Sequence, residues 1–341
     1  MLSLGVIEPS CSDWCSPVVL VPKRDGSIKF CIDFRQVNAL SKVDPYPMPR
    51  IDELVERLGK AKYITTIDLS RGYWQVPLSP RAKEVTAFRT PFGLYHFNMM
   101  PFGLQGAPAS FQRLMDRVLR GTHQFAAAYL DDVCIWSNSW EEHCRHLRQV
   151  LDHIREAGLT INPGKCALAK QEVHYLGYVI GRGVIRPQVE KVDAIQSCTP
   201  PTTKRKVRAF LGLVGWYRRF IPDFSARSSP LSELTRATAS NRVAWTEQCE
   251  AAFQDLKGAV CSDSVLRSPD FSKPFIVQTD ASGVGLGAVL LQEEDGQRRP
   301  VAFISRKLFD RERRYAAVEL EALAIKWALD SLRYYLPGQT V

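Results

Sequence analysis

Two adjacent aspartates, Asp131 and Asp132, interrupt an apolar run in the segment AAAYLDDVCIWS. The flanking residues are small, β-branched or aromatic, which favours two strands joined by a tight turn that carries the acids. Neighbouring carboxylates repel each other, and burying them without a partner is costly. A divalent cation would offset that cost. An Asp-Asp turn exposed to solvent is the alternative interpretation of this dipeptide.

A third acid follows another strand-like run, because Asp68 lies near the end of YITTIDL in residues 63–69. One separate and two adjacent carboxylates can supply oxygen ligands to two hard cations. Two such cations hold the attacking and leaving oxygens of an in-line phosphoryl displacement. The residues Asp68, Asp131 and Asp132 are therefore candidates for a site that holds two hard cations and transfers a phosphoryl group.

The charge balance favours a polyanionic partner. The 341 residues include 45 Lys and Arg against 36 Asp and Glu, a net charge of +9, and such an excess neutralises phosphates and releases counterions. A basic surface without a nucleic-acid role is the alternative. The nine cysteines form no CxxC pair, which indicates reduced thiols in an intracellular protein, cytoplasmic or nuclear. We see no signal peptide and no apolar run long enough to span a membrane.

The periodicity of the chain predicts an alternation of strands and helices. Asp25-Gly26 indicates a hairpin within residues 17–37, and the His143–His146 region indicates an amphipathic helix over residues 140–157. On that helix we favour a solvated face over a metal shared by the two histidines. Helices are also expected after Pro49 and Pro108, across most of 187–262, and from about 313 to 336. Strands are expected in VHYLGYVI, PFIVQTD and GLGAVLLQ.

Six ordered blocks in the first 180 residues resemble the fingers and palm of a reverse transcriptase, specifically that of gypsy-class LTR retrotransposons. The blocks are SPVVLVPKRDGSIKFCIDFRQVNAL, ITTIDLSRGYWQVPL, TAFRTPFGLYHFNMMPFGLQGAPASFQ, AYLDDVCIWS, INPGKCALA and VHYLGYVI. The resemblance implies that Asp68, Asp131 and Asp132 are the catalytic metal ligands and that they hold two Mg²⁺ ions. Gln105-Gly106 departs from the polar pair that is more common in relatives, which puts the local fit of that block in doubt.

The same resemblance implies further binding residues. Lys23, Arg24 and Lys29 fall where the fingers contact the incoming triphosphate, although an ordinary hairpin surface is the alternative. Tyr73 matches the aromatic beneath the incoming sugar, with a core aromatic as the alternative, and Phe102 and Gly103 fall in the nucleotide pocket. Lys165 matches a lysine suggested to protonate the leaving pyrophosphate, or it is a turn lysine. Leu176, Gly177 and Tyr178 resemble the primer grip.

The later segments resemble the thumb and the ribonuclease H domain of the same family. Lys204, Arg205, Lys206 and Arg208 would follow a duplex backbone, unless they form a solvated helix face. Asp280 would be the first ribonuclease H metal ligand. On the following helix the periodicity places Glu319 on the wet face and Glu321 on an apolar face, so Glu321 is the expected second ligand. The family's later acidic residues are not reached, and we expect hybrid cleavage to be absent or severely reduced.

The sequence thus predicts an α+β right-hand polymerase fold followed by a truncated RNase H-like α/β domain. We expect fingers and palm in 1–180, thumb and connection in 181–262, and the RNase H-like domain in 263–341. The predicted function is RNA-directed DNA polymerase of a retrotransposon, a nucleotidyltransferase, with a ribonuclease H endonuclease domain of doubtful activity. Its partners would be RNA and DNA template-primer, RNA-DNA hybrid, deoxynucleoside triphosphates and other parts of a polyprotein. A non-catalytic nucleic-acid-binding remnant and a polymerase restricted to DNA templates are the alternatives.

Overall fold

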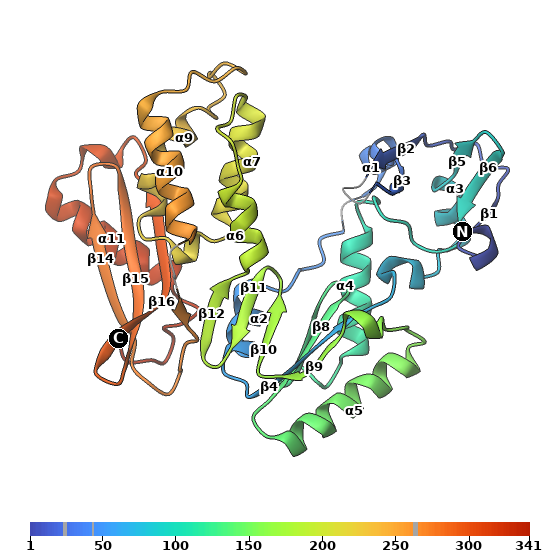
Figure 1. Cartoon of the computed structure of the whole chain (residues 1–341), viewed down its shortest axis with the longest axis horizontal. Coiled ribbons are helices and arrows are strands. Elements are labelled where there is room, and N and C mark those ends of the chain that lie inside the picture. The colour runs from blue at the N-terminus through green and yellow to red at the C-terminus, as the bar shows by residue number, and fades with distance from the viewer. Residues whose placement is uncertain (23–25, 43, 262–264) are drawn as a thin grey trace. The chain divides into compact units, whose positions relative to one another are not determined.

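The chain forms two compact units in the computed structural model, which describes residues 1–22, 26–42, 44–261 and 265–341. The first unit comprises Met1–Leu54 and Ala61–Val173, and the second comprises Val55–Lys60 and His174–Val341 (Figure 1). This separation begins the second unit a few residues before the expected border at residue 180. The three-part division expected from the sequence is not decided by it and stays a prediction.

A four-stranded antiparallel sheet forms the centre of the first unit. Its strand order is β7 (Ala126–Tyr129), β8 (Asp132–Ser137), β4 (Tyr63–Asp68) and β9 (Ala167–Lys170). The helices α4 (Ala107–Val118) and α5 (Trp140–Glu156) pack against it (Figure 1). Ile67 and Val133 of the strands share one buried cluster with Phe111 of α4 and Val150 of α5. The strands and helices predicted in this region are confirmed.

The remaining strands of the first unit form smaller sheets. One has the order β1 (Ile7–Pro9), β6 (Gly93–Phe97) and β5 (Phe88–Thr90), and β2 (Val18–Pro22) pairs with β3 (Ile28–Ile32). Val18 lies opposite Ile32 and Pro22 opposite Ile28, so the hairpin predicted in residues 17–37 is confirmed. The short helical elements here are η1 (Leu2–Leu4), α1 (Arg35–Leu40), η2 (Gly72–Gln75), α3 (Pro80–Val85) and η3 (Pro163–Lys165).

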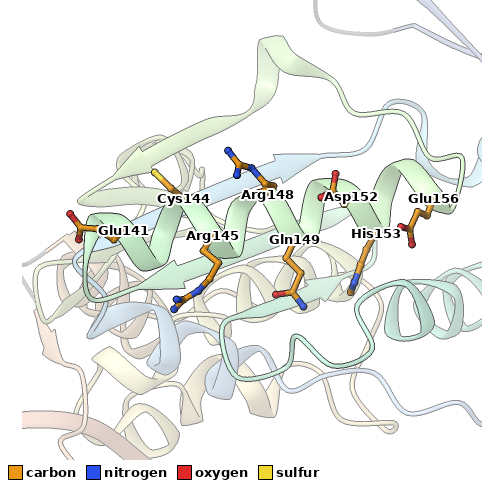
Figure 2. Close-up of a pocket in the computed structure, with 8 residues that line it drawn as sticks. All are labelled: Glu141, Cys144, Arg145, Arg148, Gln149, Asp152, His153 and Glu156. Atoms are coloured by element: carbon orange, nitrogen blue, oxygen red, sulfur yellow. The ribbon is translucent and has the colours of Figure 1, made fainter.

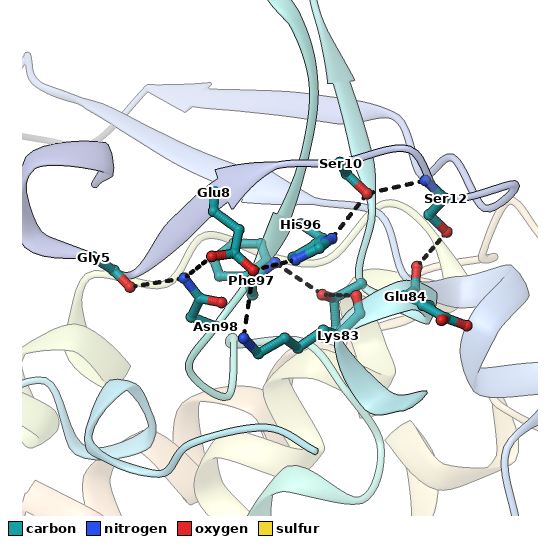
Figure 3. A network of polar contacts seen from close by, with 10 residues as sticks. Gly5, Glu8, Ser10, Ser12, Lys83, Glu84, His96, Phe97 and Asn98 are labelled. Atoms are coloured by element: carbon teal, nitrogen blue, oxygen red, sulfur yellow. Dashed lines mark hydrogen bonds and ion pairs between the residues drawn. The ribbon is translucent and has the colours of Figure 1, made fainter. Parts of the chain in front are cut away.

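Polar contacts fasten β1 to β6 where Glu8 lies opposite His96 (Figure 3). The Glu8 carboxylate accepts from His96 Nε2 at 2.8 Å, from Asn98 Nδ2 at 3.1 Å and from Lys83 Nζ at 3.4 Å. The other ring nitrogen of His96 bonds Ser10 Oγ at 2.8 Å. The His96 and Asn98 hydrogen bonds lower the pKa of Glu8 to about 2, so this carboxylate stays ionised at neutral pH and keeps the N-terminal strand in register.

Helix α5 is fixed to the sheet by a buried polar network. His143 is 1% exposed and bonds Thr65 Oγ1 at 2.8 Å and Ser137 Oγ at 3.0 Å. Ser137 Oγ also bonds His146 Nδ1 at 2.8 Å, and the His146 ring stacks on Phe125 at 3.8 Å between centroids. The expected solvated face for His143 is therefore wrong, because its polar partners lie on β4 and β8 inside the core.

This network makes the stability of the first unit dependent on pH. Burial, and then the nearby His146, lowers the pKa of His143 below its usual value, so the folded state holds the ring neutral. Stability is then fully present above the unfolded pKa of about 6.5 and is lost as pH falls below it. We predict that the thermal midpoint of unfolding decreases as the pH is lowered from 7.5 to 5. His143→Gln should be less stable at pH 7.5 and have a flatter profile; an unchanged slope would contradict the assignment.

The second unit contains two antiparallel sheets and most of the helices. One sheet has the order β10 (Glu172–Tyr175, of which His174 and Tyr175 belong to this unit), β11 (Tyr178–Gly181), β12 (Val184–Pro187) and β13 (Leu266–Arg267). The other has β14 (Ile276–Ala281), β15 (Gly285–Glu294) and β16 (Gln297–Lys307). The helical elements are α6 (Val189–Gln196), α7 (Lys204–Gly215), η4 (Arg218–Phe220), α8 (Phe224–Arg227), α9 (Ser229–Glu233), α10 (Glu247–Cys261), η5 (Glu312–Arg314) and α11 (Ala317–Ser331). VHYLGYVI, expected as one strand, is divided between β10 and β11 by a turn at Leu176–Gly177.

Both faces of the β14–β16 sheet are covered by parts of the second unit. Phe275, Val277 and Leu290 pack with Leu332 and Tyr335, at and beyond the end of α11. On the other face, the segment from Asp223 to Ser225 approaches Gly285 and Gly287 of β15. A Cβ on Gly287 would lie 2.4 Å from Asp223 Oδ1. One on Gly285 would lie 2.8 Å from the Arg306 carbonyl oxygen of β16 and 3.3 Å from Ser225 Oγ. These glycines therefore let the segment lie directly on the sheet.

A buried ion pair joins distant parts of the second unit. Glu56, on the part of α2 (Ile51–Gly59) that belongs to this unit, is 2% exposed and accepts from Arg219 Nη2 at 3.1 Å. The same carboxylate oxygen accepts a hydrogen bond from the Tyr335 hydroxyl. Three segments far apart in sequence thus meet at one carboxylate.

Among the described residues, no helix is long and apolar enough to cross a membrane.

Removing one member of this pair should destabilise the second unit strongly. Glu56→Ala leaves the Arg219 guanidinium buried without its carboxylate, which costs about 3–5 kcal/mol in comparable sites. Urea unfolding followed by circular dichroism measures the change. Glu53→Ala, on the same helix but in a partly exposed pair with Arg50, is the matched control and should change stability by less than about 1 kcal/mol. Equal effects of the two substitutions would contradict the role of the pair.

Candidate active site

The register of β4 and β8 brings Asp68 opposite Asp132. Ile67 faces Val133 in the preceding cross-strand pair, and both side chains enter the core. Because successive side chains of a strand point to opposite faces, the next pair, Asp68 and Asp132, is turned to the other face of the sheet. Directly opposed residues have Cβ atoms about 5 Å apart, so two of the three predicted acids are neighbours.

The turn between β7 and β8 places the third acid. Tyr129 pairs with Asp132, which leaves Leu130 and Asp131 as the two turn residues. Leu130 has φ 57°, a left-handed conformation that a leucine adopts only when its surroundings hold it. The Asp131 carbonyl accepts from the Leu69 N–H at 3.2 Å, so the turn is tied to the end of β4. The predicted hairpin with acids at its turn is confirmed.

Gln112 of α4 supports this turn and was missed by the sequence analysis. Its Oε1 accepts from the Leu130 N–H at 2.9 Å, and its Nε2 donates to the Ala128 carbonyl at 3.0 Å and to Asp116 Oδ1 at 2.8 Å. The side chain is fully buried. The sequence did contain a signal for this role, because Gln112 is a polar residue within the apolar face of a predicted helix. A buried amide there needs several hydrogen-bond partners.

The electrostatics of the three acids are unfavourable without a cation. Burial raises the pKa of Asp132 to about 6, with further contributions from the charges of Asp131 and Asp68, while Lys165 acts in the opposite direction. These interactions show that the carboxylates are close enough to repel one another. Across the described residues, however, no group of three His, Cys, Asp or Glu side chains is already arranged to hold a metal ion.

The donor chemistry of the three acids nevertheless suits Mg²⁺. Carboxylate oxygens are the ligands that a hard cation prefers, and a cation would relieve the repulsion that raises the pKa of Asp132. Gly72 makes room beside these ligands, because a Cβ there would lie only 3.2 Å from Asp131 Cβ. The residues therefore fit a magnesium site without forming a closed set of ligands.

Lys165, from η3, has its Nζ 3.4 Å from Asp68 Oδ2. Its side chain is exposed, so this ion pair is weak and the amine can exchange it for another anion. Lys165 therefore lies beside Asp68, one of the three predicted metal ligands.

Tyr73 of η2 packs between two phenylalanines close to the acids. Its ring centroid lies 5.0 Å from that of Phe102 and 5.4 Å from that of Phe111. Burial, and then the charge of Asp131, raises the pKa of Tyr73. Phe102 is 51% exposed, so an aromatic surface lies beside the acids. Tyr73 is half-buried and belongs partly to the core, as the alternative interpretation expected.

Gly103 follows Phe102 in a conformation that suits glycine, with φ 99°. Its carbonyl accepts from Asn38 Nδ2 at 2.9 Å, and Asn38 Oδ1 accepts from the Gln105 N–H at 2.8 Å. The unusual Gln105-Gly106 pair is therefore held through its backbone. Asn38 of α1 is a second residue that sequence reasoning missed.

The predicted triphosphate contacts are only partly observable. Lys29 is exposed on β3, opposite Val21. Lys23 and Arg24 lie outside the described residues, so their predicted roles stay predictions.

The Leu176–Gly177 turn lies in the second unit and joins β10 to β11, and Tyr178 is the first residue of β11. Leu176 and Gly177 have φ 49° and 84°. Tyr178 is buried and stacks near Trp216 and Phe220, with centroids 6.3 and 6.0 Å away. The predicted primer-grip segment is thus a tight turn backed by aromatic residues.

Only part of the basic cluster on α7 is open to a partner. Lys204 Nζ donates to the carbonyls of Arg236, Ala237 and Ala239, and Arg208 Nη2 donates to the Thr235 carbonyl at 3.1 Å. These two side chains hold the chain that follows α9. Arg205, Lys206 and Arg208 are exposed, and their phosphate-contacting role stays a prediction.

Asp280 and Glu321 occupy different surroundings. Asp280, on β14, lines a hollow of about 520 Å³ together with Asp223 and Gln278, and α11 contributes no residue to it. Glu321 is exposed, whereas the buried positions of α11 are Leu320, Ala324 and Ala328. The expected apolar face around Glu321 is therefore wrong. Glu319 accepts from the Ala316 N–H at 2.8 Å and caps the helix.

Another hollow, of about 570 Å³, follows the outer face of α5 (Figure 2). All the residues that line it belong to this helix, among them Cys144, Arg148 and Asp152. None of the predicted site residues lies there, and this surface contributes nothing to the candidate active site.

Comparisons with known proteins match both halves of the chain. A family model described as reverse transcriptase (RNA-dependent DNA polymerase) matches residues 21–180, and one described as an RNase H-like domain found in reverse transcriptase matches residues 245–341. The chain is 39% identical to the Retrovirus-related Pol polyprotein from transposon opus of Drosophila melanogaster, over 99% of this chain and 35% of that protein. The corresponding polyprotein from transposon 297 of the same organism is 40% identical, over 99% and 32%.

Solved structures agree with these matches. The foamy viral protease-reverse transcriptase dRH in complex with ds DNA has a TM-score of 0.88 at 27% identity, over 99% of this chain and 59% of that chain. The foamy viral protease-reverse transcriptase in complex with RNA/DNA hybrid has a TM-score of 0.84 at 26% identity, over 99% and 45%.

The fold is therefore the mixed α+β fold of a reverse transcriptase, followed by an RNase H-like domain. The chain belongs to the gypsy-type LTR retrotransposon Pol polyproteins and corresponds to their reverse transcriptase and RNase H-like region. It spans about a third of the length of the curated relatives described above.

Proposed function

We propose that this chain is an RNA-directed DNA polymerase that extends a primer on an RNA or DNA template by two-metal phosphoryl transfer. The observation that carries the proposal is the cross-strand pair of Asp68 and Asp132 with Asp131 in the adjoining turn. In support of the proposal, burial and the charges of Asp131 and Asp68 raise the pKa of Asp132, and a bound cation would offset both effects.

The three aspartates would hold two Mg²⁺ ions, which supply charge stabilisation to the transferring phosphoryl group. The protein itself contributes positioning. The Gln112 contacts fix the turn that carries Asp131, and the β4–β8 register fixes Asp68 against Asp132. Lys165 offers a proton donor and positive charge beside Asp68. Most of the catalytic effect then comes from preorganised geometry and electrostatics.

The aromatic surface next to the acids would receive the incoming nucleotide. The Tyr73 ring, backed by Phe111, would contact the sugar and disfavour a 2′-hydroxyl, and Phe102 and Gly103 would line the same pocket. Lys29, with Lys23 and Arg24, would contact the triphosphate. Lysine and arginine suit this task as a point charge and a planar fork of donors.

Neutralising one metal ligand should abolish extension without unfolding the protein. We predict that Asp131→Asn and Asp132→Asn each lower primer extension on poly(rA) by at least about 100-fold, since a metal ligand supports several kcal/mol of transition-state stabilisation. Asp152→Asn, on the exposed face of α5, is the matched control and should retain full activity. Duplex binding and circular dichroism should be unchanged in all three variants.

Wild-type results separate the alternatives. If folded wild-type protein binds template-primer but does not extend it with Mg²⁺, the non-catalytic remnant is favoured. If extension occurs on DNA but not on RNA templates, the chain is a DNA-directed polymerase. Near wild-type extension by Asp131→Asn would refute the metal assignment.

For the RNase H-like domain we propose little or no cleavage of RNA-DNA hybrid by this chain. Asp280 faces a hollow shared with Asp223, and exposed Glu321 does not line it. Two carboxylates alone are a poor set of ligands for a pair of hard cations.

A hybrid with a labelled RNA strand tests this proposal. We expect background cleavage with Mg²⁺ and the same background for Asp280→Asn. Glu293→Gln, which changes an acidic residue elsewhere in the same domain, is the control for unspecific effects. Robust cleavage that is lost in Asp280→Asn and kept in Glu293→Gln would overturn the proposal.

A further inference from the structure

The turn between β10 and β11 and the end of α7 are joined by two hydrogen bonds that run in opposite directions. The Tyr217 hydroxyl donates to the Gly177 carbonyl at 2.9 Å, and the Tyr178 hydroxyl donates to the Trp216 carbonyl at 3.1 Å. Each segment thus supplies one side-chain donor and one backbone acceptor. We call this reciprocal pair of bonds the tyrosine clasp.

The clasp holds a turn whose backbone needs support. Leu176 and Gly177 are both left-handed, and leucine adopts this conformation only where neighbouring contacts hold it. A Cβ on Gly177 would lie 3.3 Å from Trp216 Nε1 and 3.5 Å from Tyr217 Oη. The Gln188 N–H also donates to the Gly177 carbonyl, at 3.2 Å. The turn therefore packs closely against the end of α7, and a side chain at Gly177 would require Trp216 to shift.

The hydroxyl of Tyr217 is well suited to a permanent contact. The residue is 1% exposed, and its ring packs edge-on against Tyr178 and Phe220, with centroids 5.7 and 6.3 Å away. Burial raises the pKa of Tyr217 to about 12, so the hydroxyl remains a donor at physiological pH. An apolar ring would fill the same space, which means that the hydroxyl serves orientation rather than packing.

We propose that Tyr217 and Tyr178 are positioning residues that lock the Leu176–Gly177 turn to the end of α7, so that the turn presents the 3′ end of a bound primer in one orientation. This inference rests on the proposed polymerase function and on the assignment of Leu176, Gly177 and Tyr178 to the primer grip. Neither hydroxyl contacts the reacting atoms. Their effect passes through the backbone carbonyls that they bind and organise.

Conservative substitutions separate orientation from packing. Tyr217→Phe and Tyr178→Phe each delete one hydroxyl and keep the ring. For each, we expect the Kd for template-primer to stay within about twofold, while the single-turnover extension rate of bound primer falls about fivefold to tenfold, the usual effect of one lost neutral hydrogen bond. The double variant should lose less than the product of the two single effects, because the bonds act as one unit.

A matched control excludes a general effect of removing a tyrosine hydroxyl. Tyr315→Phe alters an exposed tyrosine of the same unit and should extend primers at the wild-type rate. Thermal midpoints of all variants, measured in parallel, show whether the loss of rate follows a loss of folded protein. A rate that falls only in proportion to unfolding would overturn the proposal.

A binding readout keeps the test independent of catalysis. A primer that ends in 2-aminopurine reports the stacking of its 3′ nucleotide through its fluorescence, without any nucleotide addition. We expect the bound emission to differ between wild type and Tyr217→Phe but not between wild type and Tyr315→Phe. Identical emission in all three would overturn the clasp, whereas an inactive wild type with this expected pattern would overturn only the polymerase proposal.

Discussion

The pairing of Asp68 with Asp132 across β4 and β8 is the constraint on which the candidate site depends. A strand alternates its side chains, so the register that sends Ile67 and Val133 into the core must send these acids to the other face. A shift by one residue would bury the acids and expose the apolar pair. The hydrophobic core of the first unit and its proposed catalytic face are therefore specified by the same set of backbone hydrogen bonds.

The strands, the hairpins and the candidate acids could be predicted from the sequence because each of them has a local sequence pattern. The Asp-Asp pair between two apolar runs, the β-branched strand before Asp68 and the hairpin at residues 17–37 all have period-2 or turn patterns that few other structures satisfy. What could not be predicted depends on tertiary partners. Gln112 and Asn38 form hydrogen bonds with backbone groups outside their own helices, and the residues around them in the sequence do not predict which groups these are.

The two wrong predictions, for His143 and Glu321, also failed because they depend on tertiary partners. His143 lies on an amphipathic helix whose polar residues suggested a solvated face, but Thr65 and Ser137 satisfy its ring inside the core. Glu321 was placed on an apolar face with Ala317, Val318, Ala324 and Ile325. Of these four residues only Ala324 is buried, and α11 buries it in a stripe with Leu320 and Ala328. Periodicity identified a helix in each case. It could not decide which side of the helix meets the protein.

The glycines of β15 have a consequence for how such chains can be recombined. Gly287 leaves room for the Asp223 side chain against the strand, and Gly285 leaves room for both the Arg306 carbonyl of β16 and the Ser225 hydroxyl. A chimera that took the RNase H-like sheet from one relative and the preceding helices from another would meet a clash wherever a larger residue replaced either glycine. Exchange between such elements should therefore succeed only when the junction lies upstream of Asp223, and the two parts should be inherited together.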